Sequence, residues 1–306
     1  MLGTLMKVPL KSVRYFVGEA VLDGLEKAAA NMPLWLVRLF MDTIFFSLYP
    51  LIIVLPSYRN TTIKNLTMSL GGELSRREIR RIARRSMRNI FRMPGDVLFY
   101  GSPKHLDRLR RDVTINGTEH LTKAFANGKG VIGLGAHMTG FLLLTMRLAN
   151  SDIPFIVPTK DPRNDMLKRK LRGWRDECNV KYIDVDTPDK GKRQISKSLA
   201  DNKLVYLIAD ERKKRGGIVV PFFGRDALTA VGSAVFSLKT GAPIIPIFVA
   251  ATAKGFAVDI FPPLKRPSGD DDQAVYELTC RANQAIEDYI RAHPDQWTWV
   301  QQRWRM

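Results

Sequence analysis

The sequence predicts an α/β fold in which a central, mainly parallel sheet is flanked by helices and is preceded by an N-terminal membrane-associated helical segment. The first observation is that short β-rich runs alternate with helical segments from residue 113 onward. Such alternation produces βαβ units and therefore parallel strands. The second is size, because 306 residues with 45% hydrophobic content can bury a large core. We expect strands over 130–136, 153–159, 180–185, 204–210 and 243–250, and helices near 140–150, 164–177, 191–201 and 230–240.

Residues 1–57 form the predicted N-terminal membrane-associated segment. Its apolar part, residues 33–56, is longer than the ~20 residues that a helix needs to cross a bilayer. It starts too late for a cleavable signal peptide, and no small-residue cleavage site ends it. Arg38 and Asp42 stand four positions apart and could pair on one helix face, which would lower the cost of insertion. The alternative is a buried helix of a soluble core.

Residues 58–112 are predicted to form a basic helical arm packed on the core. Ser75 followed by Glu78 three positions later is typical of a capping box that starts a helix. The helix is amphipathic and could bind the phosphates of lipid headgroups, although a solvated helix face is the alternative. Its apolar positions are Ile79, Ile82, Ala83, Met87, Ile90 and Phe91, and its basic positions are Arg76, Arg77, Arg80, Arg81, Arg84, Arg85, Arg88 and Arg92.

Residues 113–306 are treated as one α/β domain because no repeat or low-complexity linker divides them. The runs 216–223 and 255–263 are predicted as added antiparallel strands, and a last helix spans about 271–293. Cys178 and Cys280 match neither a metal-binding spacing nor a disulfide framework, which indicates a reducing compartment.

The charge of the chain indicates a negatively charged partner. The sequence has 48 Lys and Arg against 30 Asp and Glu, a formal net charge of +18. Such a balance suits nucleic acid, an anionic membrane surface or an acidic carrier protein. We do not expect nucleic acid, because no RRM, KH or zinc-finger pattern accompanies the basic residues.

The candidate active-site residues follow the predicted strands. In an open α/β sheet, ligands bind beyond the carboxyl ends of the strands. His137 comes just after the first of these strands and is the candidate base, and Thr139 and Gly140 follow it in a tight turn whose backbone N–H groups could bind an oxyanion. No thiol nucleophile and no metal cluster accompanies them. The other residues that follow strands are Thr159, Lys160, Asp210, Glu211 and Arg212.

Three blocks of sequence resemble the lipid A late (lauroyl/myristoyl) acyltransferases of the lysophospholipid acyltransferase-like superfamily. These are GVIGLGAH, then LVYLIADERKKRGGIVVPFFGRDALTAVGSAVFSLKTGAPIIPIF, then HPDQWTWVQQRWRM, and the resemblance covers about residues 58–304. It implies an O-acyltransferase of the bacterial cytoplasmic (inner) membrane, with its catalytic domain on the cytoplasmic side. Such an enzyme takes a fatty acyl chain from acyl carrier protein or a coenzyme A thioester and needs no further cofactor. The acceptor is a hydroxyl of a membrane (glyco)lipid.

One position departs from the family pattern. The family places an Asp or Glu five residues after the histidine, where this chain has Leu142. That carboxylate would orient the imidazole and stabilise its cationic form. Three explanations stay open: another rim carboxylate takes over, with Asp210 or Glu211 as the best candidates; His137 acts alone on the reactive thioester; or the protein is a catalytically impaired lipid-binding or biosynthetic scaffold of the same fold.

Four cations are candidate contacts to phosphate or headgroup oxygens, because each lies in a loop just beyond or near a strand end. They are Lys160, Arg163, Arg212 and Arg225. The alternative for Lys160 or Arg163 is a structural ion pair with Asp210. Trp297, Trp299 and Arg303 match the closing motif of the family, although aromatic packing also explains the tryptophans.

Overall fold

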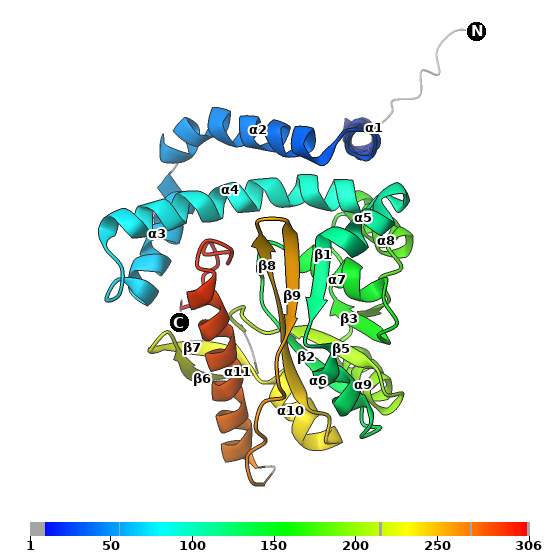
Figure 1. Cartoon of the computed structure of the whole chain (residues 1–306), viewed down its shortest axis with the longest axis vertical. Helices are drawn as coiled ribbons and strands as arrows, with labels where there is room; N and C mark the ends of the chain where they lie inside the picture. The colour runs from blue at the N-terminus through cyan, green and yellow to red at the C-terminus, as the bar shows by residue number, and fades with distance from the viewer. Residues whose placement is uncertain (1–9, 55, 214–215, 270, 305–306) are drawn as a thin grey trace, which may run out of the picture.

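A seven-stranded sheet in the order β1-β9-β8-β2-β5-β3-β4 forms the centre of the molecule (Figure 1). The structure, a computed structural model of the whole chain, describes residues 10–54, 56–213, 216–269 and 271–304. Neighbouring strands are parallel except for β8 and β9, so the predicted fold class is confirmed. The strands are β1 (Val113–Asn116), β2 (Val131–Gly135), β3 (Phe155–Thr159), β4 (Tyr182–Asp184), β5 (Leu204–Ile208), β8 (Ile244–Thr252) and β9 (Gly255–Ile260).

Helices flank the sheet, and a separate antiparallel hairpin of β6 (Gly217–Phe222) and β7 (Arg225–Ala230) stands beside it. The predicted antiparallel strands are both confirmed, since β6 pairs with β7 and β9 pairs with β8. Strand β2, in the middle of the sheet, is buried along its whole length, and its neighbours β5 and β8 are buried over most of theirs. The flanking helices are α6 (Thr118–Phe125), α7 (Phe141–Ala149), α8 (Asp165–Glu177), α9 (Pro188–Ala200), α10 (Gly232–Thr240) and α11 (Asp272–Ala292).

The N-terminal third is helical and covers one end of the sheet. In Figure 1, α4 crosses above β8 and β9, and α2 lies on the outer side of α4. The predicted capping box is present at the start of α4: the Ser75 amide donates to Glu78 Oε2 at 2.9 Å, and the Glu78 amide donates to Ser75 Oγ at 3.3 Å. The helices here are α1 (Leu10–Asn31), α2 (Leu34–Val54), α3 (Pro56–Leu70), α4 (Arg76–Tyr100), the 3₁₀ turn Pro103–His105 and α5 (Leu106–Asp112).

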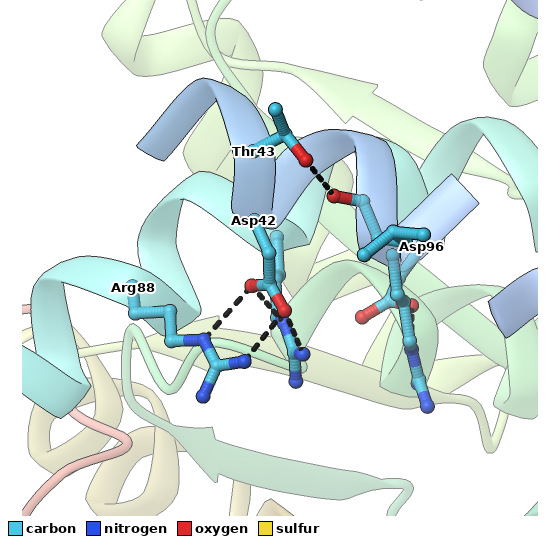
Figure 2. Close-up of polar contacts among 7 residues, drawn as sticks. Asp42, Thr43, Arg88 and Asp96 are labelled. Atoms are coloured by element: carbon cyan, nitrogen blue, oxygen red, sulfur yellow. Dashed lines mark hydrogen bonds and ion pairs between the residues drawn. The ribbon is translucent and has the colours of Figure 1, made fainter. Parts of the chain in front are cut away.

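Arg38 and Asp42 of α2 do not pair with each other, so that expectation is wrong. Both reach across to α4: Arg38 Nε donates to Asp96 Oδ1 at 2.7 Å, and Asp42 accepts hydrogen bonds from Arg88 and Arg92 (Figure 2). Both side chains face α4, where each finds a residue of opposite charge within hydrogen-bonding distance. Ion pairs between the helices therefore hold α2 against α4.

No helix within the described residues combines the length and the apolar content that crossing a bilayer requires. Helix α2 carries Arg38 and Asp42 and contains Pro50. Membrane association of 33–56 stays a prediction, as does the division of the chain at residues 57 and 112. Residues 1–9 and 55 of the predicted segment lie outside the described residues.

Candidate active site

Two adjacent parallel strands bring His137 and Asp210 together. Gly135, the last residue of β2, is in register with Ile208, the last residue of β5. His137 and Asp210 each follow two positions later, so they leave the same edge of the sheet side by side. Gly135 is required at this crossing, because a Cβ there would lie 2.2 Å from the hydroxyl oxygen of Tyr206. The positions predicted from the carboxyl ends of the strands are thus neighbours in space.

The Asp210 carboxylate is fully buried and accepts three hydrogen bonds. Its Oδ1 lies 2.7 Å from His137 Nδ1, and its Oδ2 accepts the His137 backbone amide at 2.9 Å and the Trp297 indole N–H at 2.6 Å. A buried carboxylate without such donors would be costly to keep ionised. With them, it fixes both the ring orientation of His137 and the tautomer that carries hydrogen on Nδ1.

The pair shifts both pKa values toward the charged forms. Burial alone would lower the pKa of His137, but the negative charge of Asp210, the hydrogen bond with it and the more distant Glu211 raise it above its usual value. Burial would likewise raise the pKa of Asp210, but the charge of His137 and the hydrogen bonds from His137 and Trp297 lower it. Asp210 therefore stays ionised while His137 titrates.

The imidazole of His137 is partly exposed. The His137 side chain is 24% exposed, and its Nε2 lies 3.6 Å from Oε1 of Glu211, whose side chain is 64% exposed. The ring of Phe141 packs against it edge to face, with ring centroids 5.3 Å apart. Asp210 thus contacts Nδ1 on one side of the ring, and Nε2 lies on the other side, near the exposed Glu211.

The C-terminal segment lies directly against this site. Met138 and Trp297 form an antiparallel bridge, and Thr298 Oγ1 donates to the His137 carbonyl at 3.1 Å. Trp297 is fully buried. Sequence reasoning explained this tryptophan by packing and missed its bond to Asp210. The available signal was chemical, because a buried indole N–H needs an acceptor.

Thr139 and Gly140 are both buried beside His137. The amide of Met138 donates to the Ala136 carbonyl at 2.8 Å, and the amide of Thr139 donates to the Gln296 carbonyl at 2.7 Å. These two amides of the predicted oxyanion turn are therefore engaged within the fold. A Cβ at Gly140 would lie 3.1 Å from Phe256 and from Val249, so close packing favours glycine there.

The four cations predicted to contact phosphate oxygens lie on different parts of the fold. Lys160 and Arg163 are exposed in the loop after β3. The backbone of Arg212 forms an isolated antiparallel β-bridge with Thr229 of β7. Arg225 Nε donates to the Met68 carbonyl of α3 at 3.1 Å. Within the described residues, no hydrogen bond or ion pair joins any of these four to His137.

The alternative of an ion pair between Asp210 and Lys160 or Arg163 is wrong. The partners of Asp210 are His137 and Trp297, and the loop after β3 contains its own carboxylate, Asp161. Asp161 is buried and binds Arg172 and Arg175 of α8, each at 2.6 Å. Its carboxylate lies close to those of Asp184 and Asp186, but the two guanidinium groups already occupy it.

Arg303 supports the β6–β7 hairpin rather than the histidine. It is fully buried, donates to the Leu228 carbonyl at 3.0 Å and to Thr229 Oγ1 at 2.6 Å, and lies over the ring of Phe222. Burial lowers its pKa to about 10. This residue of the closing motif therefore fixes the hairpin against the C-terminus.

A partly exposed histidine whose Nδ1 contacts a buried carboxylate, at the carboxyl edge of an α/β sheet, is an arrangement with which enzymes can activate a hydroxyl by general-base catalysis. The chain belongs to the bacterial lipid A biosynthesis acyltransferase family, whose model matches residues 25–306. It is an acyltransferase. The match begins at residue 25, so it reaches further toward the N-terminus than the resemblance over residues 58–304.

The curated relatives that the chain resembles are also named as acyltransferases. The chain is 25% identical over 221 residues to the phosphatidylinositol mannoside acyltransferase of Mycobacterium tuberculosis (strain ATCC 25618 / H37Rv), with 72% of this chain and 67% of the relative covered. The enzyme of the same name from Mycolicibacterium smegmatis is 23% identical, with coverages of 72% and 69%. The lipid A biosynthesis palmitoleoyltransferase of Escherichia coli (strain K12) is 23% identical over 202 residues, with coverages of 65% and 63%.

Proposed function

We propose that this protein transfers a fatty acyl chain from a thioester donor to a hydroxyl of a glycolipid acceptor, with His137 as the general base and Asp210 as the carboxylate that orients it. The observation that carries the proposal is the 2.7 Å contact between Asp210 Oδ1 and His137 Nδ1. It supplies the carboxylate that the family pattern would place at Leu142. Of the three explanations for Leu142, it favours the takeover by Asp210.

The chemistry follows from the two ring nitrogens. His137 Nε2 removes the proton from the acceptor hydroxyl as its oxygen attacks the thioester carbonyl, and Asp210 stabilises the imidazolium that forms. The tetrahedral intermediate then breaks its C–S bond. The thiolate leaves with the proton from Nε2, which restores the neutral histidine and releases an ester and a free thiol.

The acceptor class rests on the relatives. Two of their names specify a phosphatidylinositol mannoside and one specifies lipid A, and all of these are glycolipids. We therefore infer a glycolipid hydroxyl for this chain. A lipid acceptor and the cytosolic donors, acyl carrier protein or coenzyme A thioester, together favour a location on the cytoplasmic face of the bacterial inner membrane.

Positive charge fits both substrates. The formal net charge of +18 attracts an anionic membrane surface and would also steer an acidic carrier protein. Lys160 and Arg163 are exposed beyond the end of β3, which is next to β5 in the sheet, and they are proposed contacts to phosphate oxygens. Thr139, Gly140, Arg212 and Arg225 are proposed to border the same substrate.

The proposal is tested in cells and with purified membranes. Lipid mass spectrometry of cells with and without the gene should show one species, heavier by one acyl chain, that disappears on deletion. Membranes that carry the protein should release free thiol from an acyl donor, and the His137→Ala variant should not. Unchanged lipid profiles in cells that express the protein, together with no thiol release, would contradict acyl transfer and favour a lipid-binding scaffold.

A further inference from the structure

A basic groove runs along the solvent side of α4, apart from His137. It is a hollow of about 950 Å³ between α4 and the second half of α2, whose contribution is Phe46 and Tyr49. The buried positions of α4 face the opposite way. Because a helix rises about 1.5 Å per residue, the cations extend over about 16 Å. The arginines that line the basic groove are Arg77, Arg80, Arg81, Arg84, Arg85 and Arg88.

Positive charge dominates the basic groove. Arg88 shares the carboxylate of Asp42 with Arg92 (Figure 2). Within the described residues, the other five arginines form no salt bridge. Glu78, the one carboxylate in the lining, is bound to Ser75 in the capping box. The basic groove therefore holds an array of guanidinium groups that are free to bind an anion.

Aromatic rings hold two of these guanidinium groups in place. Arg84 Cζ lies 5.5 Å from the ring centroids of Phe46 and Tyr49, and Arg88 Cζ lies 5.5 Å from that of Phe46. A guanidinium that stacks on a ring keeps its N–H edge available for a second partner. That edge matches the oxygens of a phosphate in bidentate geometry.

Exposed apolar side chains lie along α2, the helix whose second half forms one wall of the basic groove. Trp35 is 66% exposed and Phe40 is 52% exposed, and Leu39, Phe46 and Leu48 of the same helix are also exposed. In Figure 1 the helix that carries them, α2, is on the outer side of α4. Large apolar side chains next to phosphate-binding cations suit the interface of a bilayer, where rings enter the headgroup layer and arginines meet the phosphates. An acidic protein or a free phosphate would account for the charge but not for the apolar face.

We propose that the basic groove binds the headgroup phosphates of anionic membrane lipids, while the outer face of α2 inserts between the headgroups. This inference rests on the proposed function, since it assumes an enzyme that meets its acceptor at a membrane. It adds the surface and the orientation. Ser86 Oγ of α4 donates to the Trp297 carbonyl at 2.8 Å, and Asn89 Nδ2 donates to the Asp295 carbonyl at 2.9 Å. The membrane-binding helix is thereby bonded to the segment that holds Asp210.

The experiment measures co-sedimentation of the full-length protein with vesicles, in the absence of any acyl donor. One set of vesicles is phosphatidylcholine alone, and the other is phosphatidylcholine and phosphatidylglycerol in equal parts. The groove variant is Arg80→Gln/Arg84→Gln/Arg85→Gln. The matched control, Lys190→Gln/Arg193→Gln/Lys197→Gln, removes the same charge from exposed positions of α9, which Figure 1 shows toward the other end of the sheet.

The groove variant should lose about 100-fold of its partition onto anionic vesicles, because each cation near an anionic surface contributes about fivefold. The control variant should lose clearly less, and wild-type binding should weaken strongly at high salt. A second variant, Trp35→Ser/Phe40→Ser, should weaken binding to both kinds of vesicle. Circular dichroism and thermal unfolding should show that all variants remain folded.

Equal losses in the groove and control variants would overturn the inference, because net charge alone would then explain binding. Unchanged vesicle binding in the groove variant would also overturn it. Loss of affinity for purified acyl carrier protein with vesicle binding intact would assign the groove to the donor instead. Since no acyl transfer is measured, these outcomes are independent of the tests of His137.

Discussion

Nδ1 of His137 lies 2.7 Å from Oδ1 of Asp210, and the two residues stand 73 positions apart in the chain. The contact joins the exits of two parallel strands, β2 and β5, and it is completed by an indole N–H from the C-terminus. It gives the histidine a fixed tautomer and an ionised partner.

Replacement of the base should remove catalysis but not the fold. His137→Ala is expected to lower kcat about 10³-fold, because general-base catalysis typically contributes 10² to 10⁴. The variant also leaves the buried Asp210 without its imidazole partner, so the melting temperature should fall while the protein still folds. Thiol release from the donor and thermal unfolding measure the two effects. Activity within tenfold of wild type would show that another group takes the proton.

Asp210→Asn should lower kcat about 10³- to 10⁴-fold, as loss of the orienting carboxylate does in comparable triads. It should also change the pH profile. The charge of Asp210 raises the pKa of His137, and the base must be neutral to act, so wild-type activity falls as pH decreases through that raised value. Without the charge, the acid limb should move to lower pH. A limb that stays in place would show that a different group sets it.

Glu211→Gln separates the two carboxylates near the ring. Glu211 lies 3.6 Å from Nε2, on the side of the ring opposite Asp210, and its side chain is largely exposed. Water screens such a charge, so we expect less than a tenfold loss of kcat and only a small movement of the acid limb to lower pH. A loss as large as that of Asp210→Asn would make Glu211 the essential acid.

Trp297→Phe tests the indole N–H. The change keeps most of the apolar volume and removes the donor that lies 2.6 Å from Asp210 Oδ2. One of the three donors to the carboxylate is lost, so Asp210 should orient His137 less well. We expect kcat to fall about tenfold with KM nearly unchanged. The unfolding free energy should fall by about 1–3 kcal/mol, because Asp210 Oδ2 loses one of its buried hydrogen-bond donors. Trp299→Phe, which removes a bond to the Pro294 carbonyl, is the control, and it should lower stability without a selective effect on kcat.

The ion pairs of Asp42 should appear as pH-dependent stability. Burial alone would raise the pKa of Asp42, but the hydrogen bonds from Arg88 and Arg92 lower it to about 2. A lowered pKa means that the stabilisation is complete above about pH 4, the value for an unfolded chain, and is lost as pH falls toward 2. Asp42→Asn should therefore cost about 2 kcal/mol of unfolding free energy at neutral pH, and much less at pH 2.

The control for Asp42 is Asp107→Asn, because the Asp107 side chain, which pairs with Arg110, is almost fully exposed. It should leave the stability unchanged at both pH values. Equal effects of the two substitutions would contradict a specific role for the contact between α2 and α4. Chemical denaturation followed by circular dichroism measures both.

The sequence was informative where local pattern and burial agree. Strands β2, β5 and β8 are continuous apolar runs and were predicted within a few residues. Strands β1 and β7 were missed. The first has only four residues in a polar stretch, and the second alternates exposed charges with small buried residues, so neither carries a strong strand signal.

Partners distant in sequence were harder to predict. The rule for the carboxyl ends of parallel strands was sufficient to bring His137, Asp210 and Glu211 to one rim. It did not decide between the two acids, because that choice depends on the register of β2 with β5 and on the position of Trp297. The same limit produced the wrong pairing of Arg38 with Asp42, because both residues bond to another helix.

The origin of the carboxylate on β5 has a consequence for how such enzymes are recognised in genomes. A search that requires an acid five residues after the histidine would discard this chain, since Leu142 stands there, and would label it a pseudoenzyme. The carboxylate that contacts His137, and that we propose as the orienting acid, follows the neighbouring strand and stands 73 positions downstream. Surveys of chains that lack the short motif would do better to ask whether the strand beside the histidine ends in an aspartate or glutamate.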